Sequence, residues 1–255
     1  MSKLLFDEAG KRFYHTGVSE LALFVKGASG YEAGVAWDGI SNATVTPEGG
    51  DTNDIYADNI KYLSIPGAVN VNSSITAYNY PNEFNGCLGL KALTGVKGLL
   101  FGQQPRSKFG YVYKSKLGND DSSDYGYVLN VLYNCLAAPS EISSDTVNES
   151  PEAAELSFDI STVAVARSEM PEELEDHPTS WVRIECKRGV DELLDSDGQP
   201  TTNLGKLLGA LYGTENTAPT LLTPKQIYAC LKDGTLPTDE QGASGASGAS
   251  GATQA

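Results

Sequence analysis

The chain is poor in the residues and motifs from which most catalytic sites are built. It has only two histidines, His15 and His177, and neither lies in an HExxH metal-binding pattern. No GxGxxG dinucleotide-binding pattern, GxxxxGK[ST] phosphate-binding loop or GxSxG nucleophile elbow occurs. We therefore expect the histidines to lie in the core or at the surface without a catalytic role. We also expect no cofactor, no metal site and no enzymatic activity.

Positive charge is scarce as well. The 255 residues hold 18 Lys and Arg against 33 Asp and Glu, a formal net charge of −15. A protein this acidic is not expected to bind DNA or RNA by neutralising phosphates, or to be attracted to an anionic membrane surface. No apolar run approaches the ~20 residues of a membrane-spanning helix. The acids Asp7 and Glu8 directly follow the apolar residues 4–6, which argues against a signal peptide.

The sequence also lacks closely spaced cysteine pairs and acidic residues at the spacing of a metal-binding loop. The four cysteines are far apart and form no CxxC pair, which predicts reduced, mostly buried thiols. The aspartates of residues 120–124 and 195–197 lack the spacing of an EF-hand loop, so we expect turns there. Residues 141–176 carry eleven acids and a single base, Arg167, which is typical of a solvated segment.

What the chain has in abundance is glycine, tyrosine and alternating strand patterns, which favour a β-rich fold with many turns. The most informative stretch is residues 109–151, which holds two alternating segments and two polar turns. Both faces of the segment 126–136 are largely apolar, so we expect it to be a central strand covered on both sides. One face carries Tyr127, Leu129, Val131, Tyr133 and Cys135, and the other carries Val128, Asn130, Leu132, Asn134 and Leu136.

Two further segments alternate between apolar and polar residues, which predicts half-buried strands. In residues 155–161 the apolar face consists of Leu156, Phe158 and Ile160. In residues 68–78 the apolar face consists of Val69, Val71, Ile75 and Ala77. The polar face of each strand is expected to meet water or a lumen.

The remaining elements complete an α+β fold that is mainly antiparallel β. Residues 224–232 form a predicted helix with Thr223 as N-cap and Gly234 just past its end. We expect one domain over residues 1–240 and a flexible Gly/Ala/Ser-rich tail over residues 241–255. Other expectations are a hairpin in residues 4–16, strands at 40–46, 55–65 and 181–187, a flexible loop at 47–53, the first turns of a helix in 81–93, and a helix at 203–212.

Eight stretches of the chain together form a recognisable pattern: RFYHTGV (12–18), YEAGVAWDGISN (31–42), IYADNIKYL (55–63), AYNYPNEF (77–84), FGYVYKSKLGND (109–120), GYVLNVLYNCLAAPSEISSDTVNESPEA (126–153), HPTSWVRIE (177–185) and LLGALYGTENTAPTLLTPKQI (207–227). In these stretches and in their order, over nearly its whole length, the chain resembles the major tail proteins (tail tube proteins) of long-tailed bacteriophages. Lys114, Val147 and Glu149 stand where that family's pattern has Arg, Ile and Asp.

This resemblance implies an antiparallel β-sandwich or barrel-like subunit with a flanking α-helix and long loops. Such subunits form hexameric rings that stack into a hollow siphovirus tail tube around a tape measure protein. Tail terminator and distal tail proteins lie at the two ends, and the tail is assembled in the host bacterial cytoplasm. The genomic DNA leaves through the tube without specific binding. An acidic wall suits this role, because it repels DNA within a Debye length of ~8–10 Å.

Within this framework we predict two sets of functional residues. The first set would face the lumen and consists of Glu155, Asp159, Asn70, Asn72, Ser74 and Thr76. The second set lies in two loops, residues 49–54 and 141–150, that would contact a neighbouring ring: Gly49, Gly50, Asp51, Asp54, Glu141, Asp145, Asn148 and Glu149. Residues 1–6 are a further candidate for docking on a neighbour's sheet edge.

Two alternatives stay open. One is a ring or decoration component of another phage-like assembly. The other is a carbohydrate-binding β-sandwich, which would present exposed aromatic side chains next to acids. The aromatic residues in question are Tyr111, Tyr113, Tyr125 and Tyr127, and their alternation in the strands favours packing within the sheet instead.

Overall fold

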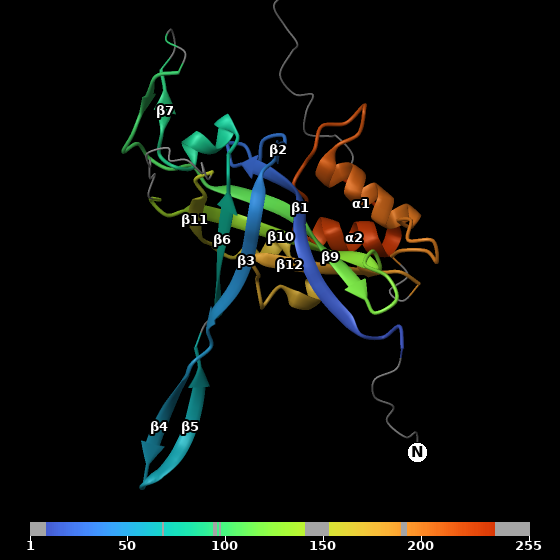
Figure 1. Cartoon of the computed structure of the whole chain (residues 1–255). Coiled ribbons are helices and arrows are strands. Elements are labelled where there is room, and N and C mark those ends of the chain that lie inside the picture. Colours follow the sequence, from blue (N-terminus) through green and yellow to red (C-terminus); the bar gives the residue numbers. More distant parts are fainter. Residues whose placement is uncertain are drawn as a thin grey trace, which may run out of the picture.

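The computed structural model describes residues 9–67, 69–93, 96, 98–140, 153–189 and 193–237. Its main feature is an eight-stranded antiparallel sheet in the order β2-β1-β9-β10-β11-β6-β3, with β12 paired to β10 (Figure 1). The mainly β, α+β class predicted from the sequence is confirmed, and within the described ranges the sheet does not close into a barrel. The strands are β1 (Phe13–Val25), β2 (Val35–Trp37), β3 (Ile40–Gly49), β6 (Val69–Ala77), β9 (Phe109–Asn119), β10 (Gly126–Ala137), β11 (Leu156–Ser161) and β12 (Trp181–Lys187).

Strand β10 is the branch point of the sheet. Along one edge it pairs with β9. Along the other it pairs with β12 at residues 126–132 and with β11 at residues 136–137. The β11–β6–β3 part packs over the rest of the sheet and encloses an aromatic core with Trp37, Phe84, Phe109, Tyr111 and Phe158. The prediction that β10 is covered on both faces is confirmed, since the residues from Val128 to Cys135 are all buried.

The helices α1 (Thr202–Tyr212) and α2 (Pro224–Asp233) cover the opposite face of the sheet and form a second core (Figure 1). Both predicted helices are confirmed. Thr223 accepts a hydrogen bond from the backbone N–H of Gln226, and the Gln226 side chain in turn accepts one from the backbone N–H of Thr223. Gly234 ends α2 with a φ of 68°. No helix in the described part of the chain is long and apolar enough to span a membrane.

A bulge at Asn134 overturns one detail of the sequence analysis. The β9–β10 register steps from Leu132 opposite Tyr111 to Cys135 opposite Phe109, so β10 carries one extra residue there. Asn134 takes a φ of 47°, a conformation that Asn tolerates better than most residues. Cys135 therefore lies in the aromatic core with Leu132, and not on the face of Tyr133 where strict alternation predicted it.

The expected flexible loop at residues 47–53 is wrong, whereas the strand character expected at 55–65 is confirmed but divided between two strands. Strand β3 continues to Gly49, and β4 (Thr52–Ala57) and β5 (Ile60–Pro66) then form a separate two-stranded hairpin. The hairpin turns at Asp58 and Asn59, whose φ angles are 51° and 63°, as in the tight turns that connect adjacent antiparallel strands. The resulting arm, residues 50–67, projects away from the body (Figure 1).

A second, shorter hairpin projects from the other end of the molecule (Figure 1). It is formed by β7 (Lys91–Ala92) and β8 (Leu100–Phe101). The helical turns expected in residues 81–93 are present as one 3-10 helix, Asn82–Gly86, which buries Phe84. Two more 3-10 helices, Arg167–Glu169 and Glu172–Leu174, precede β12.

Four expectations fall wholly or partly outside the described residues. The first half of the predicted N-terminal hairpin lies in residues 1–8. Its second half is the beginning of β1, which pairs with β9 over most of its length. The candidate docking segment at 1–6, the predicted contact loop at 141–150 and the tail at 241–255 also lie outside the described ranges.

Candidate functional site

The structure brings the residues predicted to face a lumen onto one surface. Strand β6 pairs with β11 on one side and with β3 on the other, and residues that oppose each other point to the same face. Asp159 of β11 opposes Ser74 of β6, and Ser74 in turn opposes Thr44 of β3. We call this surface the polar face, and it consists of Thr44, Thr46, Glu48, Asn70, Asn72, Ser74, Thr76, Ser157, Asp159 and Ser161.

Hydrogen bonds between neighbouring strands order the side chains of the polar face. Thr44 Oγ1 and Ser74 Oγ lie 2.7 Å apart, and Asn72 Nδ2 donates to Glu48 Oε2 at 2.8 Å. The opposite side of β6 is apolar and buried, with Ile75 and Ala77 fully covered. The three strands therefore have one face in the aromatic core and one face that is polar and open.

The polar face is hollowed where β11 meets β10. A cavity of about 600 Å³ is bounded by Glu48, Asn72, Asp159, Arg106, Leu136, Ala138 and Pro139, with several smaller polar side chains. Arg106 is the single Lys or Arg among the residues that line it, and its guanidinium donates to the carbonyl oxygen of Ala137. The hollow is thus rich in hydroxyl, amide and carboxylate groups, and its one cation is engaged by the backbone.

Glu155 lies at the end of the polar face, directly before β11, and is exposed. A hydrogen bond from the Tyr78 hydroxyl to the Glu155 carboxylate raises the pKa of Tyr78, because the anion favours the protonated phenol. Asp159 is also exposed, whereas Asn72, Ser74 and Thr76 are half-buried. The structure therefore brings together all six residues of the first predicted set.

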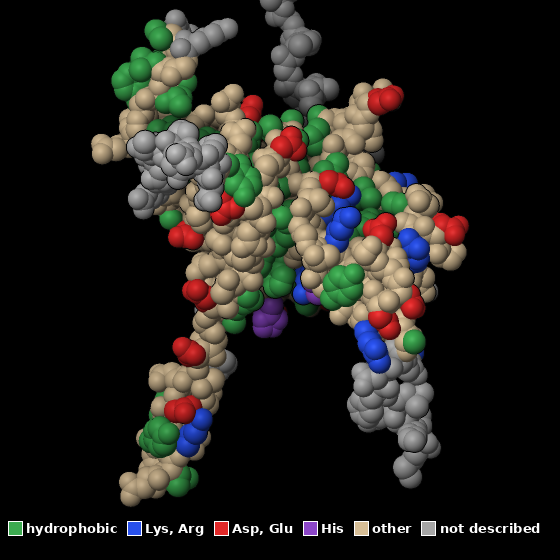
Figure 2. Space-filling view, in the orientation of Figure 1, with side chains coloured by type: hydrophobic (Ala, Val, Ile, Leu, Met, Phe, Trp, Pro, Cys, Tyr) green, Lys and Arg blue, Asp and Glu red, His purple; other side chains and the backbone are tan. Residues whose placement is uncertain are grey.

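Of the second predicted set, Gly49, Gly50, Asp51 and Asp54 lie at the base and along the first strand of the arm. Asp54 pairs with Lys61 at 2.8 Å and accepts a hydrogen bond from the Ser64 hydroxyl, and these contacts lower the pKa of its carboxyl. The arm exposes many large apolar side chains, namely Ile55, Tyr56, Ile60, Tyr62, Leu63 and Ile65 (Figure 2). The other four predicted residues, Glu141, Asp145, Asn148 and Glu149, lie outside the described residues.

The tyrosines that a carbohydrate site would need are mostly covered. Tyr111 is fully buried, and burial raises the pKa of Tyr113 to about 12. Tyr127 is half-buried, and the ring of Tyr125 lies 5.1 Å from that of Phe13. The prediction that these tyrosines serve packing is confirmed for Tyr111 and Tyr113. The expected burial of the cysteines is also confirmed, since all four are free and buried.

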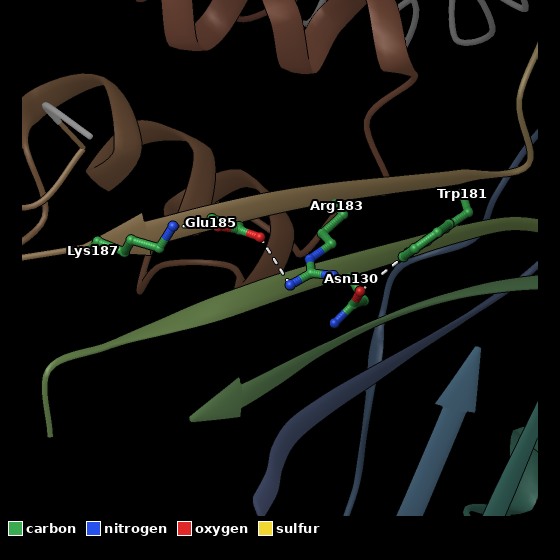
Figure 3. A network of polar contacts seen from close by, with 5 residues as sticks. All are labelled: Asn130, Trp181, Arg183, Glu185 and Lys187. Atoms are coloured by element: carbon green, nitrogen blue, oxygen red, sulfur yellow. Dashed lines mark hydrogen bonds and ion pairs between the residues drawn. The ribbon is translucent and has the colours of Figure 1, made fainter. Parts of the chain in front are cut away.

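Sequence reasoning missed a polar network on β12 and β10 (Figure 3). Trp181 Nε1 donates to Asn130 Oδ1 at 3.1 Å, and the Glu185 carboxylate accepts from both Arg183 and Lys187, at 2.8 and 2.6 Å. The hydrogen bond from Lys187 is the main reason that the pKa of Glu185 is lowered. The signal was present in the sequence, because these four residues of β12 alternate with its apolar residues Val182, Ile184 and Cys186.

The network borders a groove of about 510 Å³ between β1 and β3. His15, Asn42, Tyr113, Trp181 and Arg183 are among the residues that line it. No group of three or more His, Cys, Asp or Glu side chains in the described part of the chain is placed to hold a metal ion. His177 is exposed and is not among the residues that line the groove.

Comparisons with known proteins give a likeness in fold only. No family model matches the chain, and no characterised protein matches its sequence. The baseplate of the anti-feeding prophage contains a chain with 13% identity, covering 72% of this chain and 97% of the other, at a TM-score of 0.35. The SPP1 tail tube matches at 12% identity, 56% and 73% coverage and a TM-score of 0.32.

A third similar structure is the sheath–tube complex of an extracellular contractile injection system. Its chain matches at 11% identity, covers 71% of this chain and 93% of the other, and has a TM-score of 0.34. At this level of similarity the matches carry no conclusion about function.

Proposed function

We propose that the chain is the structural subunit of a bacteriophage tail tube, with no catalytic role. Six copies would form a ring, and rings would stack into a hollow tube in the virion tail. The observation that carries the proposal is the two-faced β3–β6–β11 layer, whose inner face lies in the core while its outer face is polar. The sequence resemblance to tail tube proteins over nearly the whole chain supports the same function.

In this proposal the polar face lines the lumen. Glu48, Asp159 and Glu155 supply negative charge, and the remaining side chains of the face are neutral hydroxyls and amides. Each luminal Lys or Arg would add a favourable contact with a DNA phosphate and slow the passage of DNA. A wall of acids and neutral groups instead keeps the DNA centred and mobile. Arg106, the cation in the hollow, is held by the Ala137 carbonyl.

The arm would make the contact between rings. Six large apolar side chains on a two-stranded hairpin are more than an isolated hairpin can bury, and exposed apolar patches of this kind mark interaction surfaces. The arm therefore suits a subunit that stays soluble until it meets a partner. A tape measure protein inside the tube, tail terminator and distal tail proteins at its ends, and assembly in the host cytoplasm complete the proposal.

Electron microscopy of the purified protein at high concentration tests this function, with and without the tape measure protein of the same phage. We expect hollow tubes or rings with six-fold symmetry, and the partner to promote their formation. Particles that stay monomeric in the presence of the partner would contradict the proposal and favour a decoration or binding module. A reconstruction of the tubes would also identify the strands that line the lumen.

A further inference from the structure

Two hairpins project from opposite ends of the molecule, and each exposes more apolar surface than it can bury (Figures 1 and 2). The arm is one of them. The other, which we call the upper hairpin, comprises the described residues from Lys91 to Phe101, with β7 and β8 joined through two backbone-paired positions. Its exposed large apolar side chains are Leu93, Val96, Leu99, Leu100 and Phe101. An isolated two-stranded hairpin is marginally stable in water, so both hairpins need a partner surface.

The two hairpins carry opposite charge. The arm, residues 50–67, holds three acids and one base. Residues 91–108, which include the upper hairpin, hold four Lys and Arg and no acid, in a chain whose net charge is −15. Within the described part of the arm, the base Lys61 is paired with Asp54, and the side chains of Asp51 and Asp58 are exposed. At the other end Lys91 and Lys108 are exposed.

From this complementarity we infer that the arm of one copy docks on the upper hairpin of a second copy of the same chain. The apolar side chains of the two hairpins cover each other, and the acids of the arm face the exposed lysines Lys91 and Lys108. Electrostatic complementarity of this kind fixes the register of a contact and excludes like-charged surfaces. Two arms cannot pair in the same way, because both are acidic.

The geometry gives this contact a direction. A contact between two different surfaces of the same molecule is head-to-tail, and it generates rings or open-ended stacks rather than closed dimers. Because the arm and the upper hairpin lie at opposite ends (Figure 1), each added copy presents a free surface for the next one. The inference rests on the proposed function for its biological setting and names the surface that receives the arm.

Charge exchange tests the contact. The arm variant Asp51→Lys/Asp58→Lys and the hairpin variant Lys91→Glu/Lys108→Glu should each raise the critical concentration for assembly by about tenfold or more. A chain that carries all four substitutions should assemble nearly as well as the wild type, because the opposite charges face each other again. The effect should weaken at ~1 M salt, where the Debye length is about 3 Å.

The matched control for the arm variant is Asp197→Lys/Glu215→Lys, which makes the same charge change at exposed positions outside both hairpins. We expect it to assemble like the wild type. If the arm and hairpin variants also assemble like the wild type, or if the fourfold variant is no better than the two double variants, the inference is overturned.

A cross-linking experiment separates this inference from the proposed function. One copy carries Ile60→Cys on the arm and a second carries Leu100→Cys on the upper hairpin, while the four native cysteines are buried. Disulfides between a copy of one variant and a copy of the other should exceed disulfides between two copies of the same variant. Arm–arm disulfides in excess would overturn the inference. Head-to-tail cross-links in assemblies without a lumen would uphold it and contradict the tail tube.

Discussion

At the scale of single residues, Lys114 joins the sheet to the helical layer. Its ammonium group lies 5.1 Å from the ring centroid of Tyr127 and 4.9 Å from that of Tyr212, and it pairs with the Glu20 carboxylate. The hydroxyl of Tyr212 donates to the backbone carbonyl of Glu20 at 3.0 Å. The Lys114 ammonium group of β9 therefore contacts side chains of β1, β10 and the end of α1, and it is largely covered from water.

We predict that Lys114→Met lowers the free energy of unfolding by about 1–3 kcal/mol, because it removes two cation–π contacts and a partly buried ion pair. Lys114→Arg should stay within about 1 kcal/mol of the wild type, since a guanidinium also stacks on aromatic rings. Urea denaturation of the monomer measures the free energy of unfolding of both variants. Lys116→Met, at an exposed position of the same strand, is the control. An equal loss in the control would assign the effect to strand propensity.

The buried tyrosines predict a loss of stability at alkaline pH. Burial raises the pKa of Tyr113 to about 12 and that of Tyr31 to about 12. The unfolded chain ionises near pH 10, so the stability from each group is complete below pH 10 and is lost as pH rises towards 12. Tyr113→Phe should reduce this loss by about 2 kcal/mol.

The measurement is the free energy of unfolding at a series of pH values between 8 and ~12. Tyr62→Phe on the arm serves as control, because Tyr62 is 69% exposed. A Tyr113→Phe variant with the same slope as the wild type would show that this phenol does not drive the alkaline loss.

At the scale of elements, the arm is separable from the body. The backbone N–H of Gly67 donates to the carbonyl of Asp51 at 2.9 Å, so the two ends of the arm meet at its base. Strands β3 and β6 continue their pairing on the body side of that point, from Gly49 opposite Val69 onward. The arm also contributes nothing to either buried core.

Replacing residues 52–65 by a two-residue Asn-Gly turn should therefore leave a folded monomer that no longer assembles. We expect its free energy of unfolding to stay within about 1 kcal/mol of the wild type, since surface changes away from the core have small effects. Circular dichroism tests whether the shortened chain folds, urea denaturation measures its free energy of unfolding, and electron microscopy shows whether it assembles. Tubes formed by the shortened chain would show that the arm is not an assembly contact.

At the scale of the whole molecule, the distribution of charge predicts how an assembled tube treats DNA. Asp159→Lys combined with Glu155→Lys places cations on the polar face at exposed positions, so folding and assembly should persist. Tubes of this variant should retain linear duplex DNA during sedimentation at ~150 mM salt, and the retention should fall steeply as salt is raised.

Wild-type tubes should retain little DNA under the same conditions. The variant Asp197→Lys/Glu215→Lys has the same net charge and controls for binding outside the polar face. Equal retention by both variants would show that the polar face does not line the lumen.

Local pattern was sufficient for much of the fold. Strands β9, β10, β11 and β12 and both helices were predictable because period-two alternation and helix caps act between residues close in sequence. The polar sides of β6 and β11 were predictable for the same reason. The Asp58–Asn59 turn also has a local signal, since two polar residues stand between alternating segments.

The amino-acid sequence by itself determined the class of the protein, its acidic character and which side of each strand is polar. Only the tertiary structure decided that β6 and β11 are neighbours, so that Asp159 and Ser74 share one surface. It also decided that Cys135 turns into the aromatic core, and that the two charged hairpins lie at opposite ends. Pairing between distant strands depends on the shared burial of their apolar faces, and no local pattern encodes which strands will meet.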